Sequence, residues 1–192
     1  VVTVDSRAEV LMPFIAATEV HPTVITSKGR SMHISEGINL SLSLIEQWKK
    51  EHAKTIDFDG YLPTLVMMTA GKTIGESIHD RAVAIDTLNS IAERSITVVT
   101  IKVGSTDADY ALQGLNANTK GENSSLAAAV NFIRQRKEDL VSNPTPRIAV
   151  ALCLDNSGSM EGEPIAELNE GIRVFYDAIL SDEMTRYSVE VC

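Results

Sequence analysis

One apolar run near the end of the chain constrains the fold more than any other feature. Residues 147–155 read RIAVALCLD, and the residues between the Arg and the Asp are all apolar. A strand of this composition has apolar side chains on both faces, so both faces must be covered, as in a parallel sheet between helical layers. Similar runs occur at 1–6 (VVTVDS), 62–71 (LPTLVMMTAG), 96–104 (ITVVTIKVG) and 187–192 (YSVEVC). Together they predict a mostly parallel sheet.

Amphipathic patterns separate these runs. Apolar residues recur along one stripe at three-to-four-residue spacing, which is typical of helices with one buried face. The patterns cover residues 34–48, 80–94, 124–140 and 164–180. Alternating strands and helices predict a doubly wound α/β fold, with a mostly parallel central sheet flanked by helices. At 192 residues and 44% hydrophobic, the chain suits a single domain over 1–192, with the Pro-containing stretch 141–146 as a linker.

The composition excludes several classes of function. The formal net charge is −9, with 26 acidic and 17 basic residues. This charge repels phosphate backbones and anionic lipids, so we expect no nucleic-acid or membrane partner. No apolar stretch approaches the roughly 18 residues of a membrane helix, and VVTVDSRAEV is not a signal peptide. The two cysteines, Cys153 and Cys192, lie in apolar runs and are predicted to be buried, reduced thiols of a cytoplasmic protein.

The loop DNSGSM, residues 155–160, carries the chemistry of the chain. Ligands of an open parallel sheet lie at the carboxyl ends of its strands, and Asp155 ends the most apolar strand. The alternating residues Asp155, Ser157 and Ser159 can turn their oxygens to one point, and Gly158 lets the backbone bend. Such ligands suit a hard divalent cation, namely Mg²⁺, Mn²⁺ or Ca²⁺. The same composition is also typical of a turn or a helix N-cap, so both interpretations stay open.

A family resemblance supports the metal interpretation. The segment RIAVALCLDNSGSMEGEPIAELNEGI resembles the first strand, metal loop and first helix of a von Willebrand factor A (vWA) domain, and it is similar to bacterial intracellular members near the tellurium-resistance proteins. The resemblance implies a metal-ion-dependent adhesion site with the D-x-S-x-S residues Asp155, Ser157 and Ser159. It also implies a protein partner whose Asp or Glu completes the coordination of the ion.

The order of the elements differs from that of the family. The motif strand comes first in vWA domains, whereas here it begins at residue 147. If Cys192 is followed by Val1, the junction YSVEVCVVTVDSRAEVLMPF resembles the family's second strand, a tight hairpin and the antiparallel edge strand. The resemblance thus covers nearly the whole chain in circularly permuted order. A natural permutation, an engineered one and a homo-oligomer formed by strand swapping of the termini all remain possible, and we favour ends that meet within one molecule.

Two further positions of the family's metal site depart from its pattern. The family has a Thr in the loop before the helix at 34–48, and here the alignment places either Met32 or Ser31 at that position. Ser31 can bind a hard ion, whereas a thioether binds one poorly. The family also has an Asp after its fourth strand, where this chain has Ala70. We expect Thr69 to supply a replacement oxygen, so the predicted metal ligands are Asp155, Ser157, Ser159, Ser31 and Thr69.

Two functions therefore fit the sequence. One is a module that binds a partner carboxylate through a divalent ion. The other is a metal-independent scaffold, in which Met32 and Ala70 have abolished ion binding. An enzyme is not expected, since no His or pair of carboxylates is placed near the loop to act as a general base.

Overall fold

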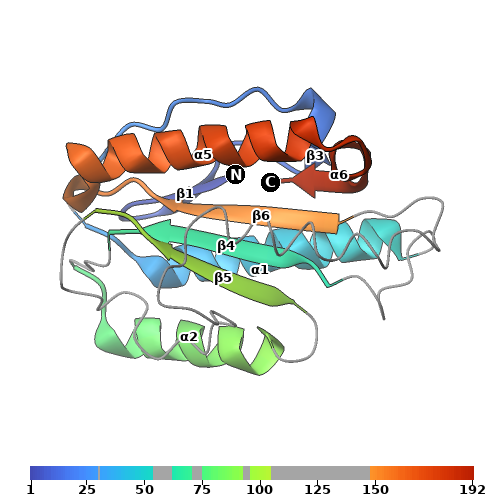
Figure 1. Ribbon diagram of the computed structural model, residues 1–192. Helices are drawn as coiled ribbons and strands as arrows, with labels where there is room; N and C mark the ends of the chain where they lie inside the picture. Colours follow the sequence, from blue (N-terminus) through green and yellow to red (C-terminus); the bar gives the residue numbers. More distant parts are fainter. Residues whose placement is uncertain (30, 54–61, 71–74, 93–95, 105–147) are drawn as a thin grey trace.

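The computed structural model of the protein describes residues 1–29, 31–53, 62–70, 75–92, 96–104 and 148–192. Within these ranges the chain is an α/β structure with one mixed, mostly parallel sheet and helices on both faces (Figure 1). The predicted helix over 124–140 and the predicted linker over 141–146 lie outside the described residues.

The central strand of the sheet is β6 (Ile148–Asp155), the most apolar run of the sequence. On one side it pairs in parallel with β4 (Thr64–Thr69), which pairs in parallel with β5 (Thr97–Lys102). On the other side it pairs in parallel with β1 (Val2–Val4), and β2 (Ala8–Val10) adds an antiparallel edge. The predicted hairpin after the first strand is therefore present.

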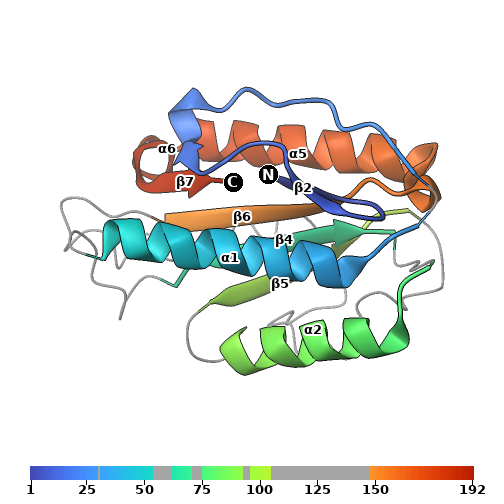
Figure 2. The same ribbon diagram turned by 180° about the vertical axis from the view of Figure 1, so that it is seen from behind.

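Helices cover the two faces of this sheet, as Figures 1 and 2 show. One face is covered by α1 (Ile34–His52) and α2 (Ile78–Ala92), and the other by α5 (Glu163–Ser181). A short helix, α6 (Glu183–Ser188), follows α5. None of the helices in the described ranges is both long and apolar enough to cross a bilayer.

The residues of β6 alternate between the two layers of the core. Val150, Leu152 and Leu154 belong to the cluster under α5, whereas Ala151 and Cys153 belong to the cluster under α1 and α2. All eight residues of the strand are buried. Burying one large apolar side chain stabilises the fold by about 1.5–3 kcal/mol, so this strand contributes strongly to the core. The continuous apolar pattern correctly predicted a strand covered on both faces.

The two ends of the chain lie in one line along β6. The last strand, β7 (Val189–Val191), pairs in parallel with residues 148–150, and β1 pairs with residues 153–155 on the same edge of β6. Cys192 lies between them: its N–H donates to the Val150 carbonyl at 2.9 Å, and its carbonyl accepts from Leu152 N–H at 2.6 Å. Residues 192 and 1 therefore face residues 151 and 152, and the register continues without a gap.

The outer side of this line is paired as well. The strand β3 (Ile15–Ala16) runs antiparallel to β7, as β2 does to β1. The α-amino group of Val1 donates to the Met12 carbonyl at 2.6 Å, and the Val1 carbonyl accepts from Leu11 N–H at 2.8 Å. Residues 11–14 of the outer edge lie opposite only residues 192 and 1. The edge therefore bulges where the two ends of the chain meet.

Gly37 shows how closely α1 approaches the sheet. A Cβ on this residue would lie 2.5 Å from Val4 Cγ2 and 2.8 Å from Cys153 Sγ. We predict that Gly37→Ala destabilises the protein, because overpacking costs about 1–3 kcal/mol and exceeds the gain of about 1 kcal/mol in helix propensity. Thermal unfolding checks this, with Ser43→Ala on the exposed side of α1 as control. A Gly37→Ala variant as stable as the control would contradict the close packing.

Candidate metal centre

Asp155 lies at the carboxyl end of β6, beside the end of β4. Its side chain is almost completely buried, with 1% exposed. The Thr69 hydroxyl donates to Asp155 Oδ2 at 2.7 Å, and the Ser157 N–H donates to Asp155 Oδ1 at 2.9 Å. Because β4 and β6 run in parallel with Met68 opposite Leu154, their two terminal polar residues meet at the same edge of the sheet. The carboxylate is held in place by both neighbouring segments.

The serines of the loop extend this cluster. Ser157 is buried, and its Oγ lies 3.0 Å from Ser159 Oγ, at hydrogen-bond distance. Ser159 belongs to a single 3-10 turn, η2 (Gly158–Met160), which leads toward α5. The structure thus brings Asp155, Thr69, Ser157 and Ser159 into one hydrogen-bonded group, which we call the oxygen cluster.

The backbone of the loop is fixed by residues that the sequence pattern did not single out. Asn156 N–H donates to the Val4 carbonyl at 2.9 Å, and the Asn156 carbonyl accepts from Lys28 N–H at 2.6 Å. The Ser27 hydroxyl donates to the Ser157 carbonyl at 2.8 Å. Lys28 acts here through its main chain, which any residue could supply, so no sequence signal could have identified it. These bonds attach the backbone of the loop to β1 and to residues 27 and 28.

Ser31 and Met32 occupy different places relative to the oxygen cluster. The Thr69 hydroxyl also lies 3.5 Å from the Met32 sulfur, and Met32 is buried. Ser31 is half-buried and lies near Gly75, where an added Cβ would be 3.2 Å from the Ser31 Cβ. Among the described contacts, no hydrogen bond joins Ser31 to the cluster. Of these two residues, Met32 is the one for which a contact with the cluster is described.

The electrostatics of the cluster favour a positive ligand. Burial raises the pKa of the Asp155 carboxyl, while the hydrogen bonds from Ser157 and Thr69 act in the opposite direction. Ala70, which follows Thr69, is buried, and the described residues include no group of three or more His, Cys, Asp or Glu side chains that could hold a metal. One carboxylate and three hydroxyls, each with lone pairs to share, are hard oxygen donors of the kind that Mg²⁺, Mn²⁺ and Ca²⁺ accept. The residues present therefore fit such an ion.

Comparisons with known proteins add no relative to this picture. No family model, no curated protein and no solved structure matches the chain. The interpretation of the oxygen cluster therefore depends on its own residues and on their surroundings.

We predict that, in the presence of EDTA, Asp155→Asn raises the melting temperature at pH 7. Because burial raises the pKa of folded Asp155 above 3.8, the folded protein binds more protons than the unfolded chain from that pH up to the raised pKa. Stability therefore falls as the pH rises through this window and stays lower above it. The uncharged Asn can still accept from Ser157 N–H and pair with the Thr69 hydroxyl.

Thermal unfolding followed by circular dichroism between pH 4 and pH 7 measures this effect. The advantage of Asp155→Asn should shrink as the pH falls toward 4. Asp86→Asn on the exposed side of α2 is the matched control and should change stability little. An advantage that is equal at both pH values would show that the charge of Asp155 is not its cause.

Proposed function

We propose that this protein is a non-enzymatic interaction module with a vWA-like, circularly permuted fold. A divalent cation (Mg²⁺, Mn²⁺ or Ca²⁺) bound at Asp155, Ser157 and Ser159 would receive an Asp or Glu side chain of a protein partner. The observation that supports this most is the buried Asp155 carboxylate, which shares hydrogen bonds with the loop and with Thr69 at the carboxyl edge of the sheet.

The charge balance explains why the module would bind carboxylates. The oxygen cluster provides one negative charge, so a bound divalent cation keeps a net charge of about +1 in a largely buried setting. Attraction between charges is stronger in such a setting than in water. An incoming carboxylate neutralises the ion, whereas neutral or cationic groups do not. Binding of ion and partner would therefore be coupled.

The residues of the cluster have different roles in this proposal. Asp155 supplies the negative charge that attracts the ion, and Ser157 and Ser159 supply neutral oxygens. Thr69 orients Asp155 through the hydrogen bond that its hydroxyl donates, and the oxygen of this hydroxyl keeps lone pairs that the bond does not use. Ser31 would have to approach the cluster to coordinate the ion.

A metal-independent scaffold is the second candidate, and one contact favours it. The Met32 sulfur lies against the Thr69 hydroxyl, where the family has an oxygen ligand, and a thioether is a poor ligand for hard cations. With Ala70 in place of a carboxylate, the cluster loses two of the family's contributions. In this version partners would bind the same loop-rich end without an ion.

Circular permutation is the structural part of the proposal. The unbroken register of β7, Cys192, Val1 and β1 along β6 supports it, because one continuous strand would pair in the same way. The faces alternate as well: Val191 and Val1 pack under α5, whereas Val2 packs under α1 and α2. Association with a second copy by strand swapping remains the alternative way to complete this edge.

A metal titration tests the proposed function. We expect chelator-treated protein to give a heat of binding and a rise in melting temperature with Mg²⁺, Mn²⁺ or Ca²⁺, since a ligand that binds only the folded state stabilises it by about 2.7 kcal/mol at 100 times Kd. Asp155→Ala should abolish both signals, and the milder Ser159→Ala should weaken them. Acetate, the smallest carboxylate probe, should then bind only the metal-loaded protein. If the wild-type protein shows neither a heat of binding nor a thermal shift, the metal-dependent module is excluded and only the metal-independent scaffold is left.

Met32 provides a test of the metal site by gain of affinity. We predict that Met32→Thr tightens divalent-cation binding about tenfold, because a hydroxyl oxygen replaces a sulfur beside Thr69. Met32→Leu, which removes the sulfur without adding an oxygen, is the matched control and should leave the affinity unchanged. Calorimetry of the two variants measures the difference. Equal affinities for both would place the ion away from residue 32.

A reordered chain tests the permutation. Residues 147–192 joined directly to residues 1–140 should fold as the present chain does and unfold at a higher temperature, because a peptide bond replaces the break in the strand. Burial lowers the pKa of the Val1 α-amino group, a cost that the peptide bond removes. One glycine inserted at the junction is the control and should destabilise the protein, since it turns the side chains of β1 to the opposite faces.

Light scattering and thermal unfolding give the readout. A monomer more stable than the present chain supports the permutation. A reordered chain that is less stable, or that tolerates the inserted glycine equally well, contradicts it.

A further inference from the structure

The sheet ends at β2, a short strand with an open outer edge. Within the described ranges β2 pairs with β1 and with no other strand. It lies near the N-terminus, where the hairpin that joins the two strands turns (Figure 2). An edge strand presents backbone N–H and C=O groups that a further strand can pair with. We call residues 6–10 the β2 edge.

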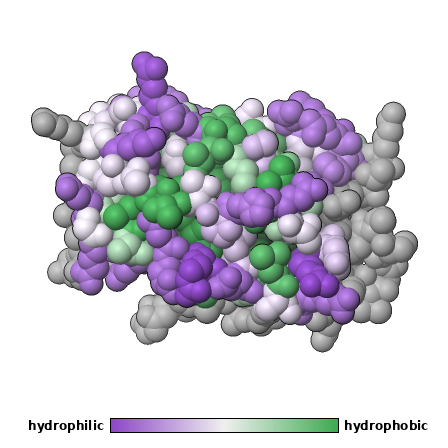
Figure 3. Space-filling view, turned by 90° about the horizontal axis from the view of Figure 1, so that it is seen from above, coloured by the Kyte–Doolittle hydropathy of each residue, from purple (hydrophilic) through white to green (hydrophobic). Residues whose placement is uncertain are grey.

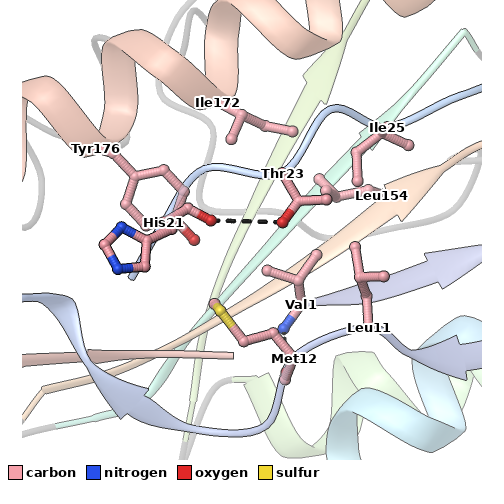
Figure 4. Close-up of a pocket in the computed structure, with 9 residues that line it drawn as sticks. All are labelled: Val1, Leu11, Met12, His21, Thr23, Ile25, Leu154, Ile172 and Tyr176. Carbon is pink, nitrogen blue, oxygen red and sulfur yellow. Dashed lines mark hydrogen bonds between the residues drawn. The ribbon is translucent and has the colours of Figure 1, made fainter. Parts of the chain in front are cut away.

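Two hydrogen bonds show which backbone groups of this edge point outward. Leu11 N–H donates to the Val1 carbonyl at 2.8 Å, and the Arg7 carbonyl accepts from the other arm of the hairpin at 3.1 Å. Figure 4 shows Val1 and Leu11 side by side. Every second residue of an antiparallel strand bonds to the same neighbour, so Ala8 and Val10 direct their N–H and C=O groups outward. None of the described segments bonds to these outward groups.

The residues on either side of Ala8 have opposite charges. Arg7 and Glu9 are exposed, and neither makes an ion pair in the part of the chain that the structure describes. They are two residues apart, so their side chains lie on the same face of the sheet. Charges on an edge strand prevent pairing with a second copy when like charges meet. Here the order Arg-Ala-Glu is complementary to itself when a second copy runs antiparallel to the first.

We propose that the β2 edge binds a second copy of this chain, by two-fold antiparallel pairing about Ala8. Ala8 of each copy exchanges both backbone hydrogen bonds with Ala8 of the other. Arg7 of each copy then lies opposite Glu9 of the other, since a two-fold axis repeats every contact. Opposed residues without backbone bonds between them have the closest side chains, which favours an ion pair. The sheet becomes continuous across the dimer.

The charges select this register among those that the backbone allows. A two-fold axis at Arg7 or at Glu9 keeps the same bonding pattern but places two like charges opposite each other, which is destabilising. An axis at Val10 places Glu9 opposite an apolar residue and reaches the bulge at residues 11–14, where the regular spacing of the edge is lost. The axis at Ala8 gives both charged residues a partner of opposite charge.

Exposed apolar side chains flank the paired residues. Val10 and Leu11 are 44% and 47% exposed, and Val24 in the neighbouring segment 23–28 is 75% exposed. Figure 3, which looks down on this segment and on α5, shows apolar patches among polar residues. Pairing about Ala8 places Val10 opposite the hairpin turn of the second copy, which removes apolar surface from water. Because the interface is short, we expect a reversible dimer with a Kd of about 100 µM.

This dimer differs from one formed by strand swapping of the termini. In a swapped dimer β1 or β7 pairs with β6 of the other copy, whereas here both strands keep their places along their own β6. The edge contact needs no metal ion. It is therefore independent of the proposed function, and its failure has no bearing on whether divalent ions bind Asp155.

Arg7→Glu and Glu9→Arg together test the proposal. Sedimentation equilibrium in EDTA should show a monomer–dimer equilibrium for the wild-type protein. Each variant opposes like charges twice and should have a Kd at least about tenfold higher. An equimolar mixture of the two variants restores opposite charges at both pairs, so its average mass should exceed that of either variant alone. A monomeric wild-type protein at about ten times the expected Kd, variants that dimerise as the wild type does, or a mixture no heavier than its components would overturn the proposal.

Lys50→Glu and Asp86→Arg are the matched controls, because they make the same charge changes at exposed positions of α1 and α2. Each should dimerise within about twofold of the wild type, and mixing them should add nothing. Amide hydrogen exchange tests the backbone bonds: exchange at Ala8 should slow as the wild-type concentration rises, whereas exchange at Glu9, which bonds to β1, should stay constant. Exchange at Ala8 that does not depend on concentration would exclude pairing along the β2 edge.

Discussion

The hydrogen bond from Thr69 to the buried Asp155 carboxylate is the interaction on which the account of this protein depends. It joins the ends of β4 and β6, two strands whose residues are all buried, and it helps to hold a charge that is almost completely removed from solvent. Burial raises the pKa of this carboxyl, so the fold keeps a group that is costly in the absence of a positive ligand. A bound cation would offset this cost, which is why the proposed ion-dependent module is consistent with a buried carboxylate.

The sheet places this carboxylate and also provides its surroundings. Parallel strands end at a common edge, so the loop after β6, Thr69 at the end of β4 and Met32 before α1 meet there. The same loop holds Asp155 against Thr69 and Ser157, and its Asn156 backbone binds Val4 and Lys28. Segment 23–28 is attached to this loop through Ser27 and Lys28.

Much of this could be predicted from the sequence because the strongest signals are physical ones. The continuous apolar run of β6 and the stripes of α1 and α5 are long enough to identify their elements, and the helices observed begin within about two residues of the patterns. Which of Ser31 and Met32 lies against Thr69 could not be predicted, because it depends on tertiary packing. Short elements such as β3 and α6, and main-chain contacts such as that of Lys28, depend on tertiary structure and leave no pattern.

Paramagnetic broadening by Mn²⁺ tests the central claim most directly, because it locates the ion without a variant. At substoichiometric Mn²⁺, the account predicts that the backbone amides of Asp155, Ser157, Ser159 and Thr69 lose intensity first, and that added Mg²⁺ restores them. Broadening confined to other acidic parts of the surface, with these four amides unchanged, would contradict it.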